Sequence, residues 1–101
     1  MRRYGRVDDN QKQIVHWLRQ AGATVQSLAT IGGGCPDLLV GFRDRNYLFE
    51  IKDGSKSPSA RQLTPDETKW HAEWKGQVYV VERPEAALLI IGATNDASGM
   101  Q

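Results

Sequence analysis

The sequence has 101 residues, a formal net charge of +1, 25% charged residues and 40% hydrophobic residues. This length suits one domain with a modest core, and the nearly balanced charge excludes a strong overall basic field. The single cysteine, Cys35, excludes an internal disulfide and a multi-cysteine zinc site, and it fits a reducing compartment. No apolar run approaches the roughly 20 residues of a membrane span, and the first residues lack the apolar stretch of a signal peptide. We therefore expect one cytoplasmic domain over residues 1–101 that does not enter a membrane.

The first half of the chain predicts one helix followed by three strands. Apolar side chains recur at helical spacing up to Gln20, and the run Gly32-Gly33-Gly34 is expected to form a loop. Two later apolar runs are joined by a polar turn and are apolar on both faces, so we expect the sheet to be covered on both sides. The expected segments are a basic arm at 1–7, a helix from residue 8 or 9 to 20, and strands at 23–31, 38–42 and 47–52.

The second half predicts a helix, a strand and a last helix. Residues 53–62 are polar and rich in serine, and we expect this segment to be mobile. Thr64-Pro65-Asp66-Glu67 is a strong helix start, with an N-cap threonine, a proline at the first position and a glutamate that completes a capping box. The expected segments are a helix from 64 to 76, a strand at 77–82, a helix at 84–90 and a polar tail at 93–101. The order α-β-β-β-α-β-α indicates a small α/β domain.

Two carboxylates and a lysine lie at the ends of the two central predicted strands. Asp37 follows a proline at the start of the first strand, and Glu50 and Lys52 end the second. A hairpin with a two-residue loop at 44–45 would place Lys52 opposite Asp37, about 5 Å away, and Glu50 diagonal to Asp37 at about 7–8 Å. Because side chains alternate along a strand, all three share one face, and a slip by one pair keeps that face.

This set of charges is typical of a divalent metal site beside a phosphate. Two carboxylates can hold Mg²⁺, which prefers oxygen ligands, and the backbone carbonyl of Ile51 is a further predicted ligand. The ion would acidify a bound water, while Lys52 would orient that water or neutralise charge on the phosphate. The pattern predicts hydrolysis of a phosphodiester. Each residue alone predicts little, because a strand Glu-x-Lys is commonly an ion pair and an aspartate after proline a turn residue.

These residues resemble the signature of the PD-(D/E)xK nuclease superfamily. Pro36-Asp37, the 12 residues that follow and Glu50-Ile51-Lys52 match it as written, and residues 34–40 resemble its VRR-NUC branch, a relative of the Holliday-junction resolvases. The resemblance implies an αβββαβ core like that of restriction endonucleases, with a mixed sheet flanked by helices. It also implies that Asp37 and Glu50 bind Mg²⁺ or Mn²⁺ and that Lys52 is catalytic.

Many members add an acidic residue from the first helix. Asp8 and Asp9 lie near that position, but Asn10 and Gln11 follow where a glutamate is expected, so a ligand from this helix stays an open question.

Further residues near this motif are candidates for contacts with nucleic acid. A glycine loop lets a phosphate backbone approach closely, and basic side chains on a flexible loop can bind phosphates. The candidates are Gly33, Gly34, Lys56, Arg61 and Gln62. The alternative for the two glycines is a loop that needs positive φ. The alternative for Lys56 and Arg61 is ordinary charge exposed to solvent. Trp70 and Trp74 are four residues apart and are expected in the core, and His71 is expected to be structural rather than a general base.

Two functions fit these observations. The first is a Mg²⁺-dependent DNA endonuclease, which could select branched, flap or junction DNA and act as a homodimer, because symmetric cutting of two strands requires two sites. The second is a nucleic-acid-binding module on the same fold without catalysis. A third and weaker reading is a structural protein in which Asp37, Glu50 and Lys52 form only an ion-pair cluster.

Overall fold

The structure, a computed structural model, describes residues 8–93, and the predicted basic arm and nearly all of the predicted tail lie outside them. The order of helices and strands agrees with the prediction. The elements are α1 (Asp9–Gln20), β1 (Thr24–Ser27), β2 (Leu38–Phe42), β3 (Arg45–Ile51), the 3-10 helix η1 (Pro58–Arg61), α2 (Pro65–Glu73), β4 (Tyr79–Val81) and α3 (Pro84–Ile91). No helix within residues 8–93 is long and apolar enough to cross a membrane.

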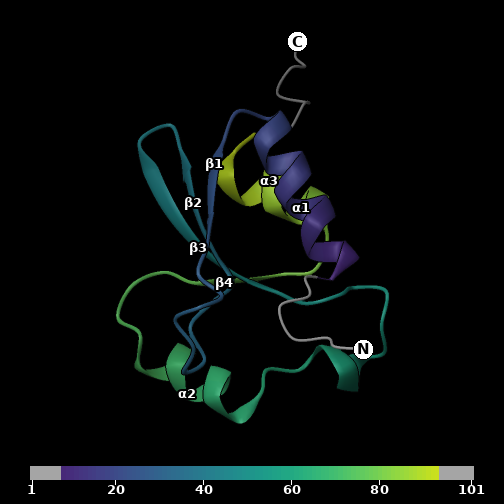
Figure 1. Ribbon diagram of the computed structural model, residues 1–101, viewed down its shortest axis with the longest axis vertical. Helices are drawn as coiled ribbons and strands as arrows, with labels where there is room; N and C mark the ends of the chain where they lie inside the picture. The colour runs from purple at the N-terminus through teal and green to yellow at the C-terminus, as the bar shows by residue number, and fades with distance from the viewer. Residues whose placement is uncertain (1–7, 94–101) are drawn as a thin grey trace.

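The four strands form one mixed sheet in the order β1-β2-β3-β4 (Figure 1). The pairs β1–β2 and β2–β3 are antiparallel, whereas β3 and β4 are parallel. Two parallel neighbours need a crossover connection, and here η1 and α2 lie in that connection. The mixed sheet expected from the sequence is therefore confirmed.

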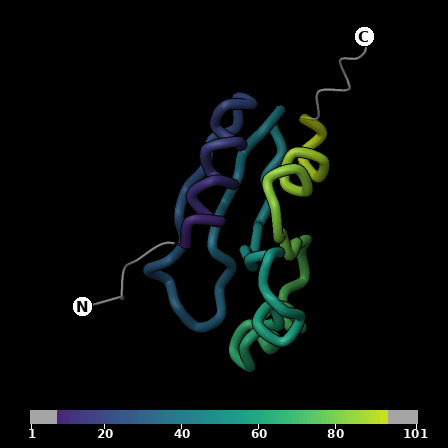
Figure 2. The backbone as a smooth tube through the Cα atoms, turned by 90° about the vertical axis from the view of Figure 1, so that its right-hand side faces the viewer, coloured from purple at the N-terminus to yellow at the C-terminus, as the bar shows by residue number. Residues whose placement is uncertain are grey.

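The core lies between the sheet and the helices α1 and α3, which lie side by side on one of its faces (Figures 1 and 2). Ile14 and Leu18 are one helical turn apart on α1 and are fully buried, as are Val40 and Phe49 of the sheet. Burial of a side chain of this size stabilises a fold by roughly 1.5–3 kcal/mol. The apolar stripe of α1 therefore holds this helix on the sheet.

The opposite face of the sheet is not covered along its length, so the expectation of two covered faces is wrong. Leu39 and Leu48 are only partly buried there, and Val80 is 44% exposed. The reason is the position of α2, which lies beyond one end of the strands rather than across them (Figure 1). α2 leaves the middle of this face open and covers only its end.

Several predicted elements are longer than the observed ones. β1 ends at Ser27 rather than at residue 31, because turns begin at residues 29–31. β4 spans only Tyr79–Val81, and α2 ends at Glu73, with Trp74 in an extended conformation. The predicted capping box at Thr64 is confirmed, because its hydroxyl accepts from the Glu67 N–H and the Glu67 carboxylate accepts from the Thr64 N–H.

The register of the β2–β3 hairpin also differs from the prediction. Phe42 pairs with Arg45, so the loop consists of Arg43 and Asp44 rather than residues 44–45. Both loop residues have positive φ, 52° and 66°, as in the type I′ turns whose twist matches a hairpin. The pairing is shifted by one residue pair, which preserves the face of each side chain. Continuing this register by one residue beyond Leu38 and Phe49 brings Glu50, instead of Lys52, opposite Asp37.

Candidate metal and nuclease site

Asp37 lies immediately before β2 and is fixed against β3 by two hydrogen bonds. Its backbone N–H donates to the carbonyl of Phe49 at 3.0 Å, and its carboxylate Oδ2 accepts from the backbone N–H of Ile51 at 2.7 Å. Because both partners belong to β3, the carboxylate is held beside the end of that strand. This position brings it next to Glu50.

Glu50 is the most deeply buried charged residue of the described chain, with only 2% of its surface exposed. Its Oε1 atom is buried and has no hydrogen-bond partner among residues 8–93. Burial, followed by the negative charge of Asp37, raises the pKa of the Glu50 carboxyl to about 9. A bound cation would compensate both effects, so this carboxylate pair has the electrostatic character of a metal site.

Lys52 forms an ion pair with α2 rather than with Asp37. Its Nζ donates to Glu67 Oε1 at 2.8 Å, and the two side chains are 14% and 18% exposed. Burial acts to raise the pKa of Glu67, but the hydrogen bonds from Lys52 and from the Thr64 backbone outweigh it and lower that pKa. The expected pairing of Lys52 with Asp37 is therefore wrong, since β3 ends before this residue and the side chain turns toward the helix.

α2 also brings His71 to the site. The Nε2 atom of His71 lies 3.8 Å from Glu50 Oε1, too far for a hydrogen bond, and it has no other partner among the described residues. The expectation of Trp70 and Trp74 in the core is wrong: α2 buries no residue, and Trp74 is 45% exposed. The two indole rings instead stack on each other, with centroids 4.6 Å apart and an interplanar angle of 18°.

The glycine loop seats α2 against the strand ends. Gly32, Gly33 and Gly34 all have positive φ. A Cβ atom on Gly34 would overlap the backbone carbonyl of Asp66 in the first turn of α2, whereas one on Gly33 would meet nothing within 4 Å. The structural reason for Gly34 is therefore a close approach to α2. Contact of Gly33 or Gly34 with nucleic acid stays a prediction.

A solved structure described as a VRR_NUC domain is similar to this chain, with a TM-score of 0.59 and 26% sequence identity. The match covers 81% of this chain and 89% of that one. The chain has a VRR-NUC-like nuclease fold. No protein-family model matches the sequence. No curated protein matches it significantly either.

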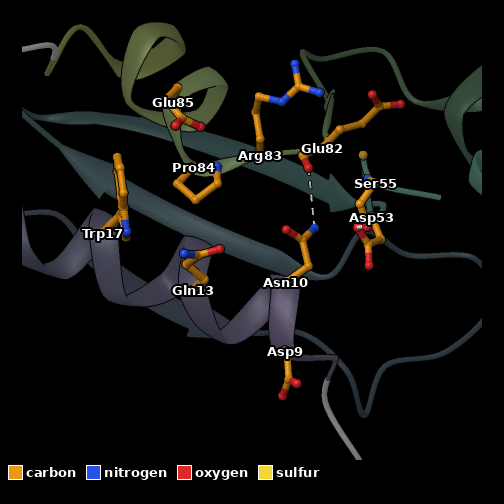
Figure 3. Close-up of a pocket in the computed structure, with 11 residues that line it drawn as sticks. Asp9, Asn10, Gln13, Trp17, Asp53, Ser55, Glu82, Arg83, Pro84 and Glu85 are labelled. Atoms are coloured by element: carbon orange, nitrogen blue, oxygen red, sulfur yellow. Dashed lines mark hydrogen bonds between the residues drawn. The ribbon is translucent and has the colours of Figure 1, made fainter.

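In this VRR-NUC-like domain the first helix contributes an amide near the candidate site. The Asn10 side chain donates to the backbone carbonyl of Lys52 at 2.8 Å and to that of Glu82 at 3.4 Å, the second of which is drawn in Figure 3. It therefore joins the start of α1 to the ends of β3 and β4. Asp9 and Asn10 both line a cavity of about 660 Å³ together with Asp53 and Glu82 (Figure 3).

The residues predicted to contact nucleic acid after β3 occupy different environments. Lys56 and Gln62 are exposed. Arg61 donates to Glu82 at 3.0 Å, so a phosphate would have to compete with this carboxylate. The segment 53–62, which was predicted to be mobile, contains the 3-10 helix η1. At its start the Asp53 carboxylate accepts hydrogen bonds from the N–H and the hydroxyl of Ser55.

The donor set fits a hard divalent cation with few protein ligands. Among residues 8–93, no three His, Cys, Asp or Glu side chains converge as a ready metal site. Two carboxylates are present, from Asp37 and Glu50, and one oxygen of Glu50 is buried without a partner. Mg²⁺ is commonly bound by one or two carboxylates while it keeps several waters or phosphate oxygens. The role of the Ile51 carbonyl as a ligand stays a prediction.

The sequence predicted Asp37, Glu50 and Lys52 for the candidate site, and it did not predict that Glu67 and His71 lie beside them. The spacing of Glu67 and His71, four positions apart, places them on one face of a helix, and this was the available signal. The sequence does not state which face of α2 meets the strands.

Proposed function

We propose that this chain is a divalent-metal-dependent DNA endonuclease, with Mg²⁺ or Mn²⁺ held by Asp37 and Glu50. The observation that supports it best is the Oε1 atom of Glu50, which is buried without a hydrogen-bond partner among the described residues, in a carboxyl group that lies beside Asp37. Such a pair is costly to the fold unless a cation neutralises it, and unpaired buried charge is concentrated at functional sites. The similarity to a VRR_NUC domain supports phosphodiester hydrolysis as the reaction.

The residues divide the work of hydrolysis between them. A bound divalent ion supplies Lewis acidity and lowers the pKa of a water. Asp37 and Glu50 provide the oxygen ligands, and Asp37 is kept in place by the Ile51 N–H. Lys52, held by Glu67 and by the backbone contact from Asn10, presents an ammonium group that neutralises charge on the phosphate. Lys56 and Gln62 would contact the DNA backbone, and Arg61 would do so once it releases Glu82.

The substrate and the assembly are part of the same proposal. A domain of this size offers little surface for reading a base sequence, so selection by shape, such as flaps or four-way junctions, is favoured. Cutting both strands of a duplex symmetrically requires two sites, which a homodimer provides. Light scattering coupled to gel filtration measures the mass of the free and DNA-bound protein and tests this assembly.

The deciding experiment is cleavage of labelled duplex, single-stranded, flap and junction DNA by the full chain in Mg²⁺, Mn²⁺ or EDTA. We expect metal-dependent cleavage that Lys52→Ala and Asp37→Asn abolish. Lys12→Ala, which changes an exposed lysine on α1, is the matched control and should cut normally. An RNA strand of the same sequence tests whether the sugar matters.

A second candidate, a nucleic-acid-binding module without catalysis, is favoured by two contacts. Asn10 stands near the position where related nucleases carry an acidic residue, and Lys52 is already neutralised by Glu67. Binding of the same DNA panel without cleavage in either metal, by protein whose folding is verified, would favour this candidate.

A further inference from the structure

Pairing the polar atoms of the site leaves two of them without a partner. Lys52 Nζ donates to Glu67 Oε1, and Asp37 Oδ2 accepts from the backbone of Ile51. Within residues 8–93, the atoms that remain buried without a partner here are Glu50 Oε1 and His71 Nε2. Buried polar atoms are rarely left unsatisfied, so a pair of them facing each other needs an explanation.

The separation of these atoms suits two ligands of one ion. Glu50 Oε1 and His71 Nε2 are 3.8 Å apart, and their side chains are only 2% and 15% exposed. Metal bonds to carboxylate oxygen and imidazole nitrogen are about 2.0–2.2 Å long, so neighbouring ligands of one ion lie roughly 3–4 Å apart. The separation is too long for a direct hydrogen bond, although it is within ion-pair distance if the imidazole is protonated.

A nitrogen ligand changes which metal the site prefers. Mg²⁺ strongly prefers oxygen ligands. Imidazole is a ligand of transition-metal ions, and Mn²⁺ is a transition-metal ion that carboxylates and water also suit. The neighbouring carboxylates of Asp37 and Glu67 keep the site negative enough for a divalent ion, even with Lys52 nearby. Arg61 Nε is also buried without a partner among residues 8–93. It cannot act as a ligand, because it carries a proton.

We propose that His71 becomes a direct metal ligand, through Nε2 beside Glu50, when a bound ion draws Asp37, Glu50 and His71 together, and that it makes the site select Mn²⁺ over Mg²⁺. The inference rests on the metal site of the proposed function. It assigns to α2 a role in choosing the metal as well as in holding Lys52.

Pulsed electron paramagnetic resonance of Mn²⁺ bound to the full chain tests this directly, because a coordinated imidazole gives a nitrogen coupling. The chain has two histidines, and the other, His16, is exposed on α1. We expect the coupling in the wild type and in His16→Gln, and its loss in His71→Gln. Calorimetric titration should show Mn²⁺ bound more tightly than Mg²⁺. His71→Gln should weaken Mn²⁺ by at least about tenfold, the effect seen even for outer partners of metal ligands, and leave Mg²⁺ nearly unchanged.

The outcomes separate this inference from the proposed function. Bound Mn²⁺ without a nitrogen coupling would overturn the role of His71 as a ligand and leave the carboxylate site intact. An equal loss of both metals in His71→Gln would also overturn it, because the histidine would then only support the fold. No binding of either metal to wild-type protein would reject the metal site and this inference together. His71→Asn provides a second variant if the glutamine variant does not fold.

Discussion

The titration of Glu50 is expected to make the stability of the fold depend on pH. Its pKa of about 9 in the folded protein lies above the ordinary value of 4.5. The folded state therefore keeps a proton that the unfolded state releases between these values. This contribution to stability is fully present below the ordinary pKa and is lost as the pH rises toward 9.

The first prediction follows for metal-free protein in EDTA. The free energy of unfolding of the wild type should decline from about pH 5 to pH 9, and Glu50→Gln should remove that part of the decline. At pH 8 the variant should be more stable by roughly 1–3 kcal/mol, the cost of a buried unsatisfied group. Urea unfolding at several pH values measures the difference. Parallel profiles for the two proteins would contradict the raised pKa.

The carboxylate of Glu67 compensates the positive charge of Lys52. Glu67→Gln should keep the helix start, because glutamine also completes a capping box, but it removes the charge that neutralises Lys52. We therefore expect tighter DNA binding in EDTA and a salt dependence steeper by about one phosphate contact. Fluorescence anisotropy over a salt series measures both. Glu73→Gln makes the same change in net charge at the exposed end of α2, and a gain as large there would contradict a local effect.

At the scale of elements, the contact between the glycine loop and α2 determines whether the site is assembled. Gly34→Ala should destabilise the fold by more than about 2 kcal/mol, because a strained positive φ is combined with overlap against the Asp66 carbonyl. Gly33→Ala has a similar φ and open space, so it should cost only about 1 kcal/mol. Thermal unfolding compares the pair. Equal losses of stability in the two variants would show that backbone strain alone, without the contact to α2, accounts for the effect of Gly34→Ala.

α2 and the β2–β3 hairpin show which features local sequence predicts and which it does not. The start of α2 was predicted in full, because Thr64 and Glu67 satisfy each other within one turn. The hairpin register was missed because Arg43 and Asp44 adopt positive φ without the glycine that normally signals such a turn. The position of His71 beside Glu50 was also missed, because it depends on how α2 docks, and docking is a property of the tertiary structure. That Asp37 and Glu50 lie close together was predictable, because strand alternation places them on one face.

For the whole molecule, metal binding and folding should be coupled. A ligand that binds only the folded state at 100 times its dissociation constant adds about 2.7 kcal/mol of stability. We expect Mn²⁺ or Mg²⁺ to raise the melting temperature at pH 8 and to do so less at pH 5, because protonated carboxyls do not bind metal. Differential scanning calorimetry with and without EDTA measures this. Asp37→Asn should show no metal-dependent rise, and a rise as large as that of the wild type would place the metal elsewhere.

The stacked tryptophans of α2 give this helix a spectroscopic signal of its own. Two indole rings with centroids 4.6 Å apart couple their electronic transitions, and the coupling depends on the helical turn between Trp70 and Trp74. Circular dichroism in the near ultraviolet should therefore carry a paired band from this helix alone. Because α2 buries none of its own residues, we expect that band to disappear at a lower temperature than the signal of the sheet. The protein thus carries an internal optical probe of the element that completes its site.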